Sequence, residues 1–207
     1  MIRVTPSPEP SNFDQNVRQP GRQFLGTNPA PNSKEFGRHN YWRRAAADLH
    51  RAYRGVCAYT SMYILPAPGT VDHFQPKSAY PALAYEWSNY RLALQKVNGY
   101  KDSAVDLIDP FTIELGWFTL EFPGCLVKPG IGLASAVADK VARTIDVLKL
   151  NADDTFVQKR CDILMELVEG RVTLDFLWAR YPFLASEVVR QGGLGVVGPL
   201  FKRQRRP

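Results

Sequence analysis

Hydrophobic positions in the C-terminal part of the chain repeat with a helical period. Between residues 132 and 149 they recur every three or four positions and fall on one face of a predicted helix. A second helix is predicted to open at residues 151–155 and to end before Gly170, a third covers residues 173–180, and a fourth begins at Pro182. The first two stripes consist of Val137, Val141, Ile145 and Leu148, and of Phe156, Ile163, Leu164, Leu167 and Val168. We interpret them as core positions of a helical part spanning residues 131–207.

The first 37 residues carry no such period. Prolines interrupt them among Asn, Ser and Gln, at Pro6, Pro8, Pro10, Pro20, Pro29 and Pro31. This composition predicts an extended N-terminal arm over residues 1–37, either a disordered tail or a segment pinned across the surface by its aromatic residues. Residues 40–53 return to a helical pattern, with Trp42, Ala45, Leu49 and Tyr53 on one face.

The centre of the chain combines strand and helix patterns. Residues 62–65 and 70–74 are short β-type runs separated by a Pro-Ala-Pro-Gly turn, which predicts a hairpin. Residues 90–101 are rich in Leu, Ala, Arg, Gln and Lys, so a helix is expected there, capped by Ser88 or Asn89. The chain should therefore contain two strands followed by a helix.

A further hairpin is predicted after this core. Residues 117–122 and 125–127 are strand-like and are joined by Pro123-Gly124. The predicted fold class is α+β, with a strand-strand-helix core inside residues 38–130, together with a preceding helix and this following hairpin.

Composition indicates one ordinary globular domain. The chain has 207 residues, of which 45% are hydrophobic and 22% charged. It contains neither an apolar run of the roughly 18 to 20 residues that a membrane helix needs nor an apolar leader. Cys57, Cys125 and Cys161 are odd in number and show no pairing pattern, which favours a reducing compartment. We expect a cytoplasmic protein that does not insert into membranes.

The positive charge lies in the flanks of the chain. The net charge is +6, and residues 1–56 carry nine basic and four acidic side chains, whereas residues 57–130 carry five and seven. A polyanion gripped by the flanks around an acidic centre fits this distribution, although a mildly basic protein without a nucleic-acid role fits it as well. The basic tail from Lys202 to Arg206 adds non-specific attraction to phosphates or is a plain charged terminus.

The predicted strand at residues 70–74 ends in a pair with catalytic potential, Asp72 and His73. A histidine with an unperturbed pKa near 6.5 can remove a proton from water at neutral pH. Neighbouring residues of a strand point to opposite faces, so Asp72 and His73 would divide their roles unless the strand bends. Asp109, before Pro110, either approaches this site or only starts a turn. His39 and His50 are interpreted as surface or capping residues.

Several segments together resemble one nuclease family. They are Cys57-Ala58-Tyr59, Val71-Asp72-His73-Phe74-Gln75-Pro76-Lys77, Tyr85-Glu86-Trp87-Ser88-Asn89-Tyr90-Arg91-Leu92, Asn98-Gly99-Tyr100-Lys101 and Thr144-Ile145-Asp146-Val147-Leu148-Lys149-Leu150-Asn151. Their order resembles the HNH (ββα-metal) endonucleases, and in particular the HNH partner of Septu-type anti-phage defence systems, whose companion is an ATPase. The resemblance implies a phage-defence endonuclease acting on DNA, with an ATPase as a partner protein.

The resemblance also assigns roles residue by residue. It makes His73 the general base, places one Mg²⁺ or Mn²⁺ on Asp72 and Asn98, lets Asn89 brace the intervening loop, and lets Lys101 face a phosphate. An asparagine at the last motif position keeps an oxygen ligand, which hard cations prefer. The basic residues expected to contact nucleic acid are Lys77, Arg43, Arg44 and Arg91, with a solvated charged helix face as the alternative for Arg43 and Arg44.

One feature of the family is missing from this chain. Its members usually hold a structural zinc with two Cys-x-x-Cys pairs, and the corresponding positions here are Cys57 with Thr60 and Leu94 with Val97. One thiolate cannot hold tetrahedral zinc, so no structural zinc is expected. Burial of Leu94 and Val97, at roughly 1.5 to 3 kcal/mol each, could replace the metal with an apolar clasp.

Two alternatives to a DNA endonuclease are compatible with the same residues. The chain could be a catalytically degenerate HNH module that binds nucleic acid or docks a partner. The motif also recognises a phosphodiester and no base, so the residues do not distinguish DNA from RNA.

Overall fold

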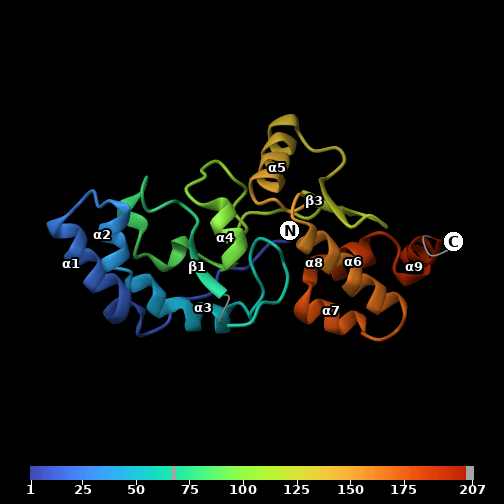
Figure 1. Cartoon of the computed structure of the whole chain (residues 1–207), viewed down its shortest axis with the longest axis horizontal. Helices are drawn as coiled ribbons and strands as arrows, with labels where there is room; N and C mark the ends of the chain where they lie inside the picture. The colour runs from blue at the N-terminus through green and yellow to red at the C-terminus, as the bar shows by residue number, and fades with distance from the viewer. Residues whose placement is uncertain (67–68, 204–207) are drawn as a thin grey trace.

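The computed structural model describes residues 1–66 and 69–203, with side chains up to residue 201, and shows an α+β protein (Figure 1). In chain order its helices and strands are α1 (Gln19–Thr27), α2 (Ser33–Arg38), α3 (Ala46–Ala52), β1 (Gly69–His73), β2 (Tyr90–Leu94), α4 (Gln95–Lys101), β3 (Phe118–Glu121), β4 (Leu126–Pro129), α5 (Ser135–Val147), α6 (Asp154–Val168), α7 (Leu174–Arg180), α8 (Pro182–Arg190) and α9 (Leu194–Arg203). Shorter turns of π- or 3₁₀-helix are Asp14–Arg18, Tyr41–Ala45, Pro81–Leu83 and Trp87–Asn89.

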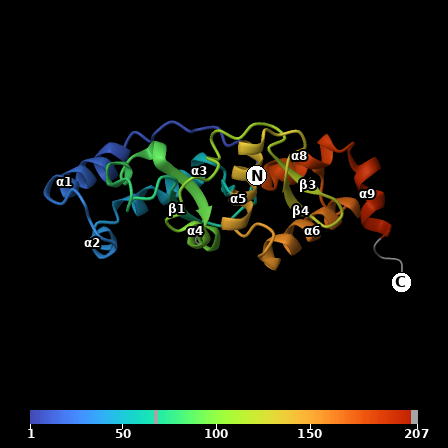
Figure 2. The same cartoon turned by 90° about the horizontal axis from the view of Figure 1, so that it is seen from above.

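The molecule is elongated. Helices α1 and α2 lie at one end, α6 to α9 lie at the other, and β1 and α4 lie between them (Figures 1 and 2). One cluster of buried hydrophobic side chains extends from Phe36 in α2 through Leu92 in β2 to Phe201 in α9. In the described part of the chain, no helix is both long enough and apolar enough to cross a membrane.

The expected extended arm over residues 1–37 is wrong beyond residue 13, because most of this region is helical. Pro20 lies in the first turn of α1, directly after the π-helical turn Asp14–Arg18, so it does not prevent a helix here. Asn32 and Glu35 form a reciprocal capping box at the start of α2, a local signal that the proline content concealed. Phe24 and Phe36 are buried, so the helices are held by packing as well as by their caps.

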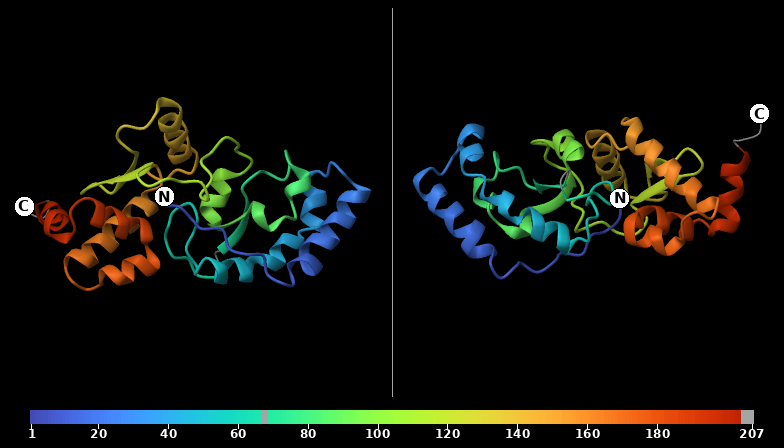
Figure 3. Two further views of the ribbon diagram at one scale, coloured as in Figure 1. Left: turned by 180° about the vertical axis from the view of Figure 1, so that it is seen from behind. Right: turned by 60° about the horizontal axis from the view of Figure 1, so that its bottom comes forward.

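The segment before residue 13 does run as an extended strap along the body. The backbone N–H of Val4 donates to the Pro110 carbonyl at 2.9 Å, and the indole Nε1 of Trp87 donates to the Ser7 carbonyl at 2.8 Å. Figure 3 shows this segment running from the middle of the molecule to α1.

The central sheet pairs different segments from those predicted. β1 pairs with β2 in antiparallel register, with Asp72 opposite Arg91 and His73 opposite Tyr90, and α4 begins at the next residue after β2. Residues 62–65 form no strand, since only the isolated bridge between Val56 and Tyr63 falls there, and residues 90–94 are strand rather than helix. The order strand-strand-helix is present, but its second strand was predicted as the first turns of the helix.

The second sheet joins β3 to β4, as the hairpin prediction required. It contacts the C-terminal helices: the backbone N–H of Leu120 donates to Glu187 of α8 at 2.8 Å, and the side chain of Asn151 bonds both backbone groups of Val127. The predicted division between residues 38–130 and 131–207 therefore separates β3 and β4 from the C-terminal helices that they contact.

The predicted helices of the C-terminal part are present as α5 to α8, and Val141, Ile145 and Leu148 are buried as expected. Helix α9 was not predicted, because paired glycines precede it and Pro199 lies within it. The turn residues 67–68 and most of the basic tail lie outside the described residues.

Candidate active site

A groove of about 1140 Å³ opens over the end of β1. One wall comes from α2 and the turn Tyr41–Ala45, the floor from β1, and the opposite wall from α4 and the residues after it. Five of the residues singled out from the sequence line it, namely Arg43, Asp72, His73, Lys77 and Asn98. The fold thus gathers these five residues from segments that are far apart in sequence.

His73 ends β1 and is nearly buried, with 6% of its surface exposed. Its Nε2 lies 2.8 Å from the carbonyl oxygen of Ala84, which can only accept, so Nε2 carries the hydrogen and Nδ1 keeps a lone pair. The rings of Trp42 and Tyr90 pack edge to face on the imidazole, with centroids 5.0 Å and 5.3 Å away. These three contacts fix both the orientation and the tautomer of the imidazole.

The electrostatic surroundings keep His73 uncharged. Burial and the nearby Lys77 ammonium lower the pKa of His73 to about 3. At neutral pH the imidazole is therefore neutral and has one nitrogen available to accept a proton.

Asp72 precedes His73 and is held by two buried partners. Its Oδ1 lies 3.1 Å from the ammonium of Lys101, and its Oδ2 accepts a hydrogen bond from the hydroxyl of Tyr59. Burial raises the pKa of Asp72, and the Lys101 ammonium opposes that shift. Burial and the adjacent carboxylate raise the pKa of Tyr59 well above its usual range, so the hydroxyl keeps the proton that it donates.

Lys101 does not occupy the outward position that the resemblance implied. Its side chain is completely buried, and its ammonium donates to the carbonyl of His73 at 2.8 Å as well as pairing with Asp72. Lys101 therefore contacts the backbone and carboxylate of the β1 end and does not line the groove.

Asn98 lies on α4, lines the groove and directly contacts β1. Its Nδ2 donates to the hydroxyl of Thr70 at 3.0 Å, and this hydrogen bond directs the nitrogen toward β1. The groove is thus lined by a carboxylate and an amide whose oxygens are of the kind that Mg²⁺ and Mn²⁺ prefer. Among the described residues no group of three or more His, Cys, Asp and Glu side chains could hold a metal. A cation on Asp72 and Asn98 would therefore keep several waters, which Mg²⁺ commonly does.

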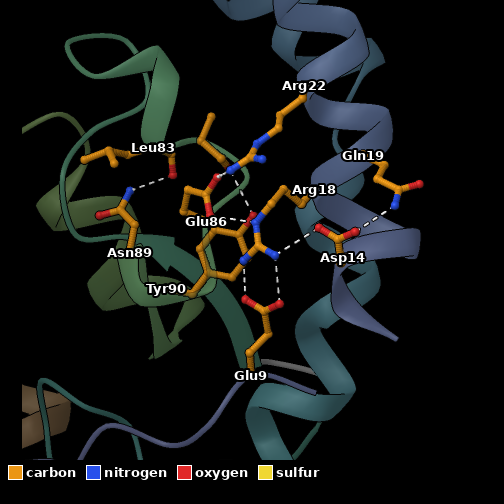
Figure 4. Close-up of polar contacts among 10 residues, drawn as sticks. Glu9, Asp14, Arg18, Gln19, Arg22, Leu83, Glu86, Asn89 and Tyr90 are labelled. Atoms are coloured by element: carbon orange, nitrogen blue, oxygen red, sulfur yellow. Dashed lines mark hydrogen bonds and ion pairs between the residues drawn. The ribbon is translucent and has the colours of Figure 1, made fainter. Parts of the chain in front are cut away.

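Asn89 lies outside the groove lining, at the base of the loop formed by residues 74–89. Its Oδ1 accepts from the backbone N–H of Gln75 at 2.8 Å, and its Nδ2 donates to the Gln75 carbonyl at 3.0 Å. The same Nδ2 also donates to the Leu83 carbonyl at 3.2 Å (Figure 4). These bonds hold the two ends of the loop together next to His73.

The same loop is tied to the N-terminal helices by charge. Glu86 accepts from Arg18 at 2.7 Å and from Arg22 at 2.9 Å, and Arg18 also contacts Glu9 and Asp14 (Figure 4). The hydrogen bonds that Arg18 donates raise its pKa, and the one to Glu9 contributes most. Helix α1 is thereby fixed to the loop that follows the candidate base.

Of the four basic residues expected to contact nucleic acid, two line the groove and two do not. Arg43 and Lys77 line the groove, and the Lys77 ammonium lies 5.2 Å from the centre of the Trp42 ring. Arg44, the neighbour of Arg43, instead lies over the Tyr41 ring at 4.8 Å and donates to the carbonyl of Asn16.

Arg91 is not placed to meet a ligand in this groove. It is 3% exposed, forms two hydrogen bonds with Asp109 at 2.9 Å and 2.7 Å, and lies 3.4 Å from the centre of the Phe111 ring. Asp109, which the sequence left as either a site residue or a turn residue, is the partner of Arg91 in this ion pair, and it does not line the groove.

Four positions that the resemblance compares with zinc ligands, Cys57, Thr60, Leu94 and Val97, lie in one region of the fold. The Sγ of Cys57 accepts from the backbone N–H of Leu94 at 3.3 Å, and Thr60 and Leu94 line one small pocket. Val97 is fully buried and Leu94 packs against the core. The contacts at these positions are hydrophobic packing of Leu94 and Val97 and the hydrogen bond to the Cys57 sulfur.

Sequence reasoning missed the roles of Tyr59 and Trp42 in the site. Tyr59 is a fully buried donor to Asp72, and Trp42 was assigned only to a helical core stripe. Neither has a local signal, because each contact joins segments that are distant in sequence. No protein-family model matches this sequence, and no curated protein matches it either.

Proposed function

We propose that the protein is a metal-dependent phosphodiester hydrolase of the HNH (ββα-metal) type, an endonuclease acting on nucleic acid. The observation that carries the proposal is a neutral histidine with an unprotonated ring nitrogen in the same groove as Asp72 and Asn98. The sequence resemblance extends the proposal to DNA as the substrate, phage defence as the setting and an ATPase as the partner.

In this mechanism His73 removes the proton from the attacking water. Nε2 is committed to the Ala84 carbonyl, so Nδ1 is the atom that accepts the proton. A divalent cation held by Asp72 and Asn98 would neutralise charge on the phosphate and on the leaving oxygen. Lys101 and Tyr59 hold the Asp72 carboxylate in place, and Asn89 holds the loop that carries the Ala84 carbonyl.

The low pKa of His73 in the free protein is compatible with this role. General bases work best when their pKa lies near the working pH. A phosphodiester anion bound in the groove would screen the Lys77 ammonium, and a nearby negative charge raises the pKa of an imidazole. The bound substrate would thus raise the pKa of His73 by offsetting the contribution of Lys77, while burial, the larger cause of the low pKa, stays in place.

The test is cleavage of supercoiled plasmid and of labelled RNA by the purified protein with Mg²⁺ or Mn²⁺, with an EDTA control. His73→Ala should lower the rate by about 10² to 10⁴. A matched control is His50→Ala, because the Nε2 of His50 bonds a backbone carbonyl at 2.9 Å in the same way but lies outside the groove. Equal activities of the two variants, or cleavage that persists in EDTA, would contradict the proposal.

A binding module without catalysis is the second candidate. The observation in its favour is that both oxygens of Asp72 are already engaged, by Lys101 and Tyr59. Calorimetric titration with Mn²⁺ separates the two: an endonuclease requires binding that Asp72→Ala abolishes, whereas a binding module would show the same titration for both proteins.

A further inference from the structure

The candidate reacting groups lie on the floor of the groove. Asp72 is 2% exposed and His73 is 6% exposed. The walls on either side come from residues 31–43 and from α4 with the residues that follow it. A scissile phosphate must therefore descend between two walls to reach His73.

The wall formed by residues 31–43 is built as a fixed part of the site. Phe36 is buried within it, and the capping box of Asn32 and Glu35 closes the start of α2. Helix α1 and the turn before it are tied through Arg22 and Arg18 to the loop that follows β1 (Figure 4). Opening this wall would break contacts on both sides of it.

A double helix is poorly suited to such a groove. Its phosphates lie on the outside of a rod that is stiff on this scale, with a persistence length of about 50 nm. A single strand can bend its backbone into the groove and turn its bases outward. The groove volume of about 1140 Å³ is slightly above the roughly 300 to 1,000 Å³ of small-ligand pockets, so it leaves room for only a short stretch of one strand.

The groove also offers a surface for an unstacked base. The ring of Trp42 lines it, is half-buried, and touches the imidazole of His73 edge to face at 5.0 Å. The Lys77 ammonium lies over this ring, and the exposed Arg43 is the next residue along the chain. Proteins bind single strands irrespective of sequence by combining an aromatic ring with a groove lined by cations, and Trp42, Lys77 and Arg43 line this groove.

We infer that the groove binds single-stranded or unpaired nucleic acid, with a base stacked on Trp42 beside the phosphate that reaches His73. This inference rests on the proposed phosphodiesterase function and narrows its substrate. Lys77 exchanges its contact with the ring for a phosphate of the bound strand, and Arg43 meets the next part of the backbone.

The test is fluorescence anisotropy with a labelled DNA strand, the same sequence as RNA, and the blunt DNA duplex, all in EDTA so that no strand is cut. The protein should bind at least one of the two single strands about tenfold or more tightly than the duplex. Trp42→Leu should weaken binding of that strand about tenfold, whereas Trp42→Tyr, which keeps an aromatic face, should retain most of it.

Two variants serve as matched controls. Trp178→Leu removes a tryptophan that is 45% exposed on α7, away from the groove, and should leave the affinity unchanged. Arg44→Gln should likewise have no effect, while Arg43→Gln, one residue away, should weaken binding. Tighter binding of the duplex, or equal losses in Trp42→Leu and Trp178→Leu, would overturn the inference.

The two proposals fail in different ways. If a single strand is preferred but nothing is cut in a His73-dependent manner, the groove is a binding site and the phosphodiesterase proposal is wrong. If cleavage depends on His73 but duplex is bound and cut at least as well as single strands, the enzyme stands and the present inference is wrong.

Discussion

The buried pair of Lys101 and Asp72 offers the sharpest test of how the site is built. Replacing Lys101 with methionine keeps most of the length of the side chain but removes the ammonium, which is completely buried. Asp72, itself 2% exposed, would keep the Tyr59 hydroxyl as its hydrogen-bond donor, and the His73 carbonyl would lose its contact at 2.8 Å. The variant therefore leaves an uncompensated charge in the interior.

The expected cost follows from that burial. Removing one partner of a buried ion pair destabilises a protein by about 3 to 5 kcal/mol. Asp72→Asn should cost a similar amount, because it leaves the ammonium of Lys101 unpaired. The double variant replaces both charges by neutral groups of similar shape, so it should lose less than the sum of the single variants by about 2 kcal/mol or more.

The stability lost in the Lys101→Met variant should also depend on pH, and it should be larger at neutral pH than in acid. Burial already raises the pKa of Asp72, and loss of Lys101 raises it further. A carboxyl whose folded-state pKa lies above its unfolded value holds its proton more tightly when folded, so stability falls as the pH rises between the two values. The Lys101→Met protein should therefore be least stable at neutral pH and recover part of its loss toward pH 4 or so, near the unfolded pKa of aspartate.

Urea denaturation followed by tryptophan fluorescence at several pH values measures all four proteins of this cycle. Strict additivity of the two single substitutions would show that Lys101 and Asp72 do not interact. A deficit of Lys101→Met that is independent of pH would show that Asp72 is not a buried carboxylate.

Three further results are expected. Burial lowers the pKa of His73 to about 3 from 6.5, so between these pH values the unfolded protein binds a proton at His73 that the folded protein does not bind. In this pH range His73→Asn should reduce the loss of stability on acidification by about 1.4 kcal/mol per pH unit, measured by urea titration. Asn89→Ala should cost about 2 to 3 kcal/mol and speed limited proteolysis within residues 74–88, whereas the exposed Ser88→Ala should do neither. Arg91→Gln should destabilise the protein by about 3 kcal/mol without changing oligonucleotide affinity, and a selective loss of affinity would contradict its assignment as a buried partner of Asp109.

The sequence predicted the parts of the fold that depend on local pattern. The stripe of Val141, Ile145 and Leu148 marked α5, because one face of that helix is buried and the other is not. The hairpin of β3 and β4 was marked by Pro123-Gly124 between two short apolar runs. In both cases the period along the chain reports the side on which the core lies.

The errors occur where burial removes the pattern. Residues 90–93 of β2 are buried on both faces, so no alternation distinguishes them, and their composition favours helix. The N-terminal helices were missed because prolines outweighed the capping residues at Asn32 and Glu35. In the site, Asp72, His73 and Asn98, which the motif singled out, line one groove, but the motif could not show that Lys101 and Arg91 turn inward. The direction of a long charged side chain depends on partners such as Asp109, which no local signal connects to it.

The construction of the groove has a consequence for how the protein folds. Its walls come from residues 31–43 and from the region of Asn98, and the chain between them must close as a long loop before the two can face each other. Closing such a loop costs entropy that is repaid only when the distant contacts form. We therefore expect helical circular dichroism to recover early during refolding and His73-dependent activity to recover late. The groove would be assembled last, after the strands and helices that hold its floor are already in place.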